Sequence, residues 1–175
     1  MAAVYGVFGA SEPPEFEADG STNCESGLVQ LRGRALVCAT QAVAEACIQC
    51  LREEDAKRVE ALEDEEEEVV VVEGEDNEEP RWVVVLLPIV CLGGQVWEAT
   101  VNHEEGGGAF AGVSGSEAAA VHMVETLHEN VRDGMRTGKE CEVPVENEGH
   151  CSGCGMEWTV VCHQLLTGVP PALAP

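Results

Sequence analysis

The C-terminal part of the chain holds the residues whose types and spacing best fit metal chemistry. Cys151 and Cys154 form a Cys-x-x-Cys pair that is followed directly by Gly155. Such a pair places two thiolates on one tight turn with backbone N–H groups nearby, which is how a zinc knuckle presents its ligands. Further candidate ligands stand close by in the sequence: Cys141, His150, Cys162 and His163.

We predict a zinc ion bound by Cys151 and Cys154 together with ligands from Cys162 and His163. Neighbouring residues on a strand point to opposite faces of the sheet, so only one of Cys162 and His163 is expected to ligate the ion. His150 and Cys141 are alternatives for the remaining position. The competing interpretation is that these cysteines are small apolar side chains of the core, and it stays open.

A second Cys-x-x-Cys pair, Cys47 and Cys50, falls inside a predicted helix, where the two thiols share one face. A thioredoxin-like redox site needs such a pair at a helix N-terminus, so a redox role is disfavoured. The histidines form no H-E-x-x-H motif, and the serines form no nucleophile elbow. The sequence therefore shows no catalytic constellation, and we expect a protein that is not an enzyme.

Acidic residues dominate the charge of the chain and are concentrated in one segment. The sequence has 33 Asp and Glu against nine Lys and Arg, which gives a net charge of −24. Residues 53–79 alone contain fifteen acidic and two basic residues, a net charge of −13. A surface of this sign repels phosphate backbones and attracts cations. We therefore expect a basic protein surface as partner, and no nucleic acid.

Four consecutive valines stand inside this acidic segment. The central residues are Glu65, Glu66, Glu67, Glu68, Val69, Val70, Val71 and Val72. Over about residues 63–76 the segment resembles a SUMO-interacting motif. The resemblance implies that Val69–Val72 adds a strand to the sheet of the small ubiquitin-like modifier while the acids meet its basic rim. Two other interpretations are a core strand paired with Trp82–Leu87 and a solvated flexible segment.

The pattern of apolar residues predicts an α+β fold, in which two helices cover one face of a mainly antiparallel sheet. An acidic loop is expected between two valine-rich strands. Helices are predicted from Thr40 to about residue 62 and from Ser114 to about residue 138, and 106–115 is predicted as a glycine-rich loop. Strands are predicted at 27–37, 69–73, 82–87, 95–102, 141–145 and 157–166. Residues 1–167 are expected to form one domain, with 53–80 partly flexible and 168–175 as a tail.

Targeting and membrane signals are not apparent in the sequence. The N-terminus lacks the basic segment of a secretory signal, and the longest apolar run, Trp82–Gly94, is too short to cross a bilayer. Nine cysteines, an odd number, suit a reducing compartment better than a disulfide framework. We therefore expect a cytoplasmic or nuclear protein without a membrane partner, and the oligomeric state is left open.

The expected function is that of a non-enzymatic interaction factor with a basic protein partner. It would act as an adaptor, an assembly factor or a regulatory subunit, with zinc as a stabilising ion. Three alternatives remain. They are a zinc-dependent hydrolase or deaminase that uses the C-terminal cluster with Glu148 or Glu157, a SUMO-binding regulator acting through Val69–Val72, and a viral regulator of host proteins.

Overall fold

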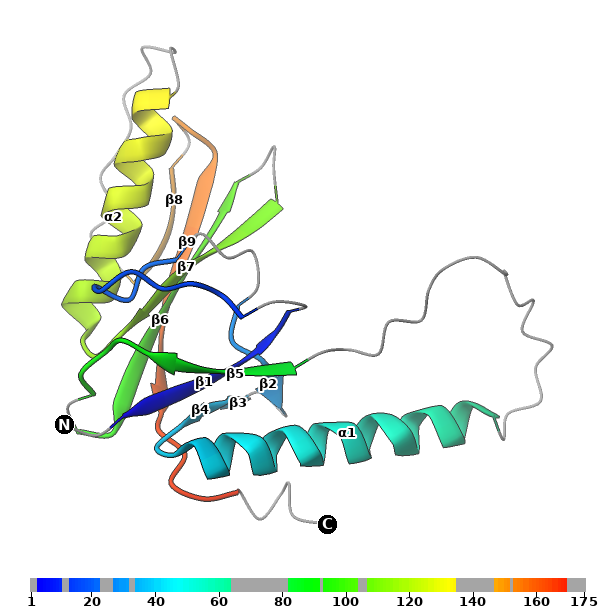
Figure 1. Cartoon of the computed structure of the whole chain (residues 1–175). Helices are drawn as coiled ribbons and strands as arrows, with labels where there is room; N and C mark the ends of the chain where they lie inside the picture. Colours follow the sequence, from blue (N-terminus) through cyan, green and yellow to red (C-terminus); the bar gives the residue numbers. More distant parts are fainter. Residues whose placement is uncertain are drawn as a thin grey trace.

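Antiparallel strands form two main sheets, and each sheet carries one helix (Figure 1). The computed structural model describes residues 3–10, 13–22, 27–31, 34–63, 82–91, 93–103, 107–134, 147–151 and 153–169. The predicted α+β class with antiparallel strands is confirmed. The strands are divided between two sheets, however, so the two helices lie against different sheets.

The first sheet has three strands in the order β4-β1-β5. These are β1 (Val4–Gly9), β4 (Val37–Cys38) and β5 (Trp82–Leu87). β1 pairs with β5 along its whole length, and α1 (Gln41–Glu63) packs against this sheet. The apolar runs of β1 and β5 suit a strand that is covered on both faces. A separate pair of short strands, β2 (Gln30–Leu31) and β3 (Arg34–Ala35), precedes β4.

The second sheet has four strands in the order β7-β6-β9-β8. These are β6 (Gln95–His103), β7 (Gly107–Ser114), β8 (Glu148–Cys151) and β9 (Met156–Gln164). Helix α2 (Glu117–Gly134) packs against β6, β7 and β9. Figure 1 shows α2 alongside the long strands β6 and β9, which run crosswise to β1 and β5 of the first sheet.

Three apolar clusters hold these layers together. One lies between α1 and the three-stranded sheet and includes Val7 and Leu51. Another lies between the two sheets, where Phe8 packs with Val96. The third lies between the four-stranded sheet and α2 and includes Trp158. Because successive side chains of a strand point to opposite faces, each sheet contributes to two clusters. The layers therefore follow one another as α1, sheet, sheet and α2.

Both helices begin at hydroxyl side chains that accept backbone hydrogen bonds, as N-cap residues do. The Val43 N–H donates to Thr40 Oγ1 at 3.2 Å, as predicted for α1. At the start of α2 the Ala119 N–H donates to Ser116 Oγ at 3.3 Å. The cap of α2 is thus Ser116, two residues after the predicted Ser114, whose hydroxyl oxygen accepts from the Ser116 N–H.

The sequence-based assignment was wrong at four places. The strand predicted at 27–37 is divided, because β2 and β3 pair with each other while β4 pairs with β1. The glycine-rich segment predicted as a loop forms β7, because its backbone pairs with β6 across a register shift between Ala99 and Thr100. Gly112 in β7 has a φ of +146°, and a Cβ there would meet the backbone of Gly20, so only glycine fits this close approach. Strands β1 and β8 were not predicted at all.

Two predicted strands, 69–73 and 141–145, lie outside the described residues, as does most of the predicted tail. Trp82–Leu87, the strand expected to pair with the valines, pairs with β1 on one edge. Of the helices in the described part of the chain, neither combines the length and apolar character needed to cross a bilayer.

Candidate metal centre

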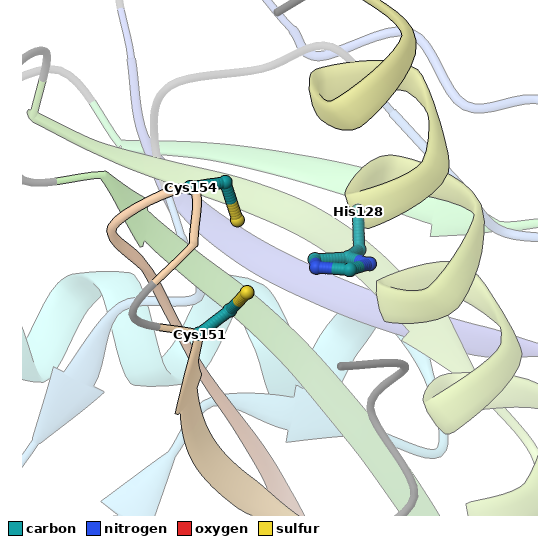
Figure 2. Close-up of side chains that lie close together, drawn as sticks. All are labelled: His128, Cys151 and Cys154. Carbon is teal, nitrogen blue, oxygen red and sulfur yellow. The ribbon is translucent and has the colours of Figure 1, made fainter. Parts of the chain in front are cut away.

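Three buried side chains from two segments of the chain meet between α2 and the β8–β9 hairpin. They are His128, Cys151 and Cys154, whose candidate ligand atoms all lie within 4.8 Å of one another. Figure 2 shows His128 projecting from α2 toward the two thiols, which lie on the turn between β8 and β9. Among the described residues this is the group of three that could hold a metal ion.

Cys151 and Cys154 are brought together by a tight turn. The Gly155 N–H donates to the Cys151 carbonyl oxygen at 2.7 Å, and Gly155 has a φ of +67°. Glycine adopts this left-handed conformation without steric cost, so the glycine that follows the cysteine pair allows the turn to close. The pairing of Cys151 with Met156 then joins the turn to β9.

His128 stands on the buried face of α2. Ala120 and Val124 precede it by eight and four residues, so all three side chains lie along one side of the helix. All three are completely buried, and the two apolar ones belong to the cluster between α2 and the four-stranded sheet. The helix thus carries the imidazole into the layer where the two thiols are found.

The His128 imidazole is buried beside the two thiols. Neither Nδ1 nor Nε2 has a hydrogen-bond partner of standard geometry within the described part of the chain, although the ring interacts with the Cys151 thiol, and the side chain is 0 % exposed. A buried polar group without a partner costs about 1–3 kcal/mol. Such a cost is removed when the nitrogen binds a metal ion, because neutral imidazole is a common metal ligand.

The surroundings of Cys151 favour its thiolate, which is the form that binds metal. Burial by itself acts to raise the pKa of this thiol. The His128 imidazole, the Cys154 amide and thiol and the Gly153 amide oppose that effect, and together they lower the pKa to about 6. The surroundings of Cys151 therefore shift its equilibrium toward the thiolate.

One imidazole and two thiolates form a ligand set that suits zinc. Zinc accepts nitrogen and sulfur ligands at about 2.0–2.3 Å in tetrahedral geometry, whereas magnesium and calcium prefer oxygen. No carboxylate of the described residues belongs to the group. The residues present could therefore hold a metal ion, and their donor atoms are those that zinc prefers.

The structure does not bring Cys162 and His163 to this group. Cys151 pairs with Met156 at the start of β9, and Cys162 lies six residues further along the strand. At about 3.3 Å per residue this places Cys162 roughly 20 Å from the turn. His163 follows Cys162 and points to the other face of the sheet, toward Glu98.

His163 forms a buried pair with Glu98 next to the cluster between the two sheets. His163 Nε2 lies 2.6 Å from Glu98 Oε2, and the two side chains are 11 % and 7 % exposed. The other carboxylate oxygen, Oε1, accepts a hydrogen bond from the Leu28 N–H at 3.3 Å. This imidazole therefore already has a partner, which lies on the neighbouring strand of the same sheet.

His128 was missed by the sequence analysis, which found no H-E-x-x-H motif and took no histidine of α2 as a ligand. The available signal was the spacing of His128 from Ala120 and Val124 on the apolar side of α2. An imidazole on that side must be buried and must find a partner. By contrast, His122 is exposed and lies 3.3 Å from Glu125.

The other predicted sites have different outcomes. Cys47 is buried and Cys50 is half-buried, both on α1, and Cys47 packs in the cluster between α1 and the three-stranded sheet with Cys38. The candidate partner-binding residues Glu65–Glu68 and Val69–Val72, and the candidate ligand Cys141, lie outside the described residues.

Comparisons with protein-family models, with curated proteins and with solved structures found no match for this chain. No relative therefore contributes to the assignment of this site, which is argued from its own residues.

The buried Cys38 and the half-buried cysteines should differ in their reactivity toward an alkylating reagent. Burial, with the nearby Cys47, raises the pKa of Cys38 to about 12, so this thiol stays protonated at pH 8. After treatment with iodoacetamide at pH 8, peptide mass mapping should show modification at Cys50 and Cys91 and none at Cys38. Modification of Cys38 should appear only when denaturant is added. Equal rates at Cys38 and Cys91 without denaturant would contradict this packing.

Proposed function

We propose that this protein is a zinc-stabilised, non-enzymatic interaction factor that binds a basic protein surface. The observation that carries the zinc assignment is the buried imidazole of His128, which faces two buried thiols and has no hydrogen-bond partner of standard geometry among the described residues. Zinc bound there would join α2 to the β8–β9 hairpin, two elements separated by residues 135–147 in the sequence. Structural zinc sites contribute folding free energy directly in this way.

The charge of the chain supports the interaction role. The net charge of −24 gives a field that attracts basic partners and accelerates their encounter. Asp and Glu outnumber Lys and Arg by 33 to nine, so few cations of the chain oppose a basic partner.

The zinc assignment is tested by substitution of the three ligands. Native mass spectrometry of the chain should show one zinc ion, and H128A, C151S and C154S should each lose it. Because the ion stabilises the folded state, a chelator should lower the melting temperature of the unaltered chain. In each variant the chelator should have little further effect.

Matched controls exist on the same elements. H122A removes an exposed histidine of α2, and C162S removes a thiol of β9, so both variants should keep one zinc ion. Retention of zinc by H128A or by both cysteine variants would contradict the assignment. So would its loss from H122A and C162S to the same extent.

A second candidate is a zinc enzyme, since the described group supplies three ligands and catalytic zinc sites keep one position open. Burial of all three side chains opposes this role, and so does the lack of a carboxylate in the group. Glu148 and Glu157, the carboxylates expected to serve such an enzyme, are exposed. Replacing zinc with cobalt distinguishes a structural site from a catalytic one. Added azide should leave the visible spectrum of the cobalt protein unchanged if the site is structural and should change it if the site is catalytic.

The interaction role is tested by neutralising the acidic run. Replacing Glu65–Glu68 with glutamine should weaken binding of identified partners of high isoelectric point, and raising the salt concentration should weaken it as well. The control carries four equivalent substitutions spread over other elements: E45Q, E53Q, E129Q and E157Q. If every partner stays bound to the first variant, or if both variants lose partners equally, the acidic run has no specific role.

A further inference from the structure

A groove of about 510 Å³ lies between α2 and the N-terminal segment 13–22, apart from the metal centre. Met123 and Leu127 of α2 form part of its apolar lining, together with Ala111 of β7. Met123 and Ala111 are almost completely buried, so the floor of the groove is continuous with the core. In Figure 1 the N-terminal segment (blue) passes beside α2 (yellow).

The rim of this groove is acidic. Glu15, Glu17 and Asp19 line it with exposed side chains, and no Lys or Arg is among the lining residues. The hydroxyl and the amide of Ser21 lower the pKa of Asp19, so this carboxylate is ionised at neutral pH. The one lining residue that could become cationic is His122, which lies 3.3 Å from Glu125.

The acidic wall is fixed in place by hydrogen bonds to β7 and within the segment. The Val113 N–H donates to the Gly20 carbonyl oxygen at 3.0 Å, and the Thr22 N–H donates to Ala111 at 3.1 Å. The Thr22 hydroxyl donates to the carbonyl oxygen of Glu15 at 2.6 Å. A wall that is ordered before binding loses less entropy when a ligand arrives, which favours affinity.

We propose that this groove binds an arginine or lysine side chain from a basic segment of a partner protein. Both side chains have an apolar stem and a charged end. The stem matches the floor formed by Met123 and Leu127, and the charged end matches the carboxylates of Glu15, Glu17 and Asp19. Charge-assisted hydrogen bonds to carboxylates give such contacts their strength. The proposal rests on the proposed function for its class of partner, but it assigns a binding site on the folded domain.

The test uses the full chain and a fluorescein-labelled peptide with one arginine between two leucines. Fluorescence anisotropy should show binding, and the same peptide with citrulline in place of arginine should bind much more weakly because it lacks the charge. E15Q/E17Q should weaken binding of the arginine peptide roughly three- to tenfold, the range expected for two partly exposed ion pairs. N130K should weaken it similarly, because it places a cation at an exposed position of the groove.

Matched variants on α1 serve as controls for charge. E45Q/E53Q removes the same two charges, and Q49K makes the same amide-to-lysine change, both far from the groove. Neither should change the affinity, and the melting temperature of every variant should match that of the unaltered chain. If the groove variants and the α1 variants weaken binding equally, or if the citrulline peptide binds as well as the arginine peptide, the proposal is overturned.

Two further measurements separate this proposal from the proposed function. Replacing Glu65–Glu68 with glutamine should not change binding of the arginine peptide. If only that variant loses binding, the peptide binds the acidic run, and the proposal that it binds the groove is wrong. The zinc content of each sample is measured in parallel. Binding that is sensitive to E15Q/E17Q in a chain without zinc would support the groove while refuting the zinc assignment.

Discussion

A completely buried imidazole must have a partner for its ring nitrogens. The arrangement of α2 and the β8–β9 hairpin depends on this constraint. His128 lies on the side of α2 that packs against the four-stranded sheet, so it cannot turn to water without removing Ala120 and Val124 from the core. Within the described residues the groups that face it are the two thiols of the β8–β9 turn. A metal ion shared by the three side chains would satisfy the imidazole and connect the helix to the hairpin at the same time.

The elements that the sequence predicted well are those with strong local signals. Thr40 and the apolar residues after it mark α1, and the apolar run Trp82–Leu87 marks β5. Pairing over long distances produced the errors. β1 is a strand because it fits between β4 and β5. β7 is a strand because its backbone pairs with β6, and its Gly112 allows close contact with Gly20. A local sequence pattern does not indicate contacts between segments that are distant in sequence. For the same reason the division into two sheets was not predicted.

The candidate site shows the same division between local and distant signals. Cys151 and Cys154 were identified because their spacing and the following glycine describe a turn in themselves. Cys162 and His163 are close to them in sequence but lie at the far end of β9, because an extended strand separates residues quickly. His128 is more than twenty residues away in sequence and enters the site only through the packing of α2. The acidic surface likewise has a local part, the run around Glu65–Glu68, and a part created by folding, the rim of the groove beside α2.

The central claim is that zinc is bound by His128, Cys151 and Cys154, and the coordination shell of the ion tests it most directly. X-ray absorption at the zinc edge of the purified chain should show two sulfur atoms at about 2.3 Å and one imidazole nitrogen at about 2.0 Å. C151S should lose the ion and, with it, this shell. In the unaltered chain, a shell made only of oxygen atoms would mean that the ion binds the acidic run, and this result, or the absence of zinc, would contradict the account.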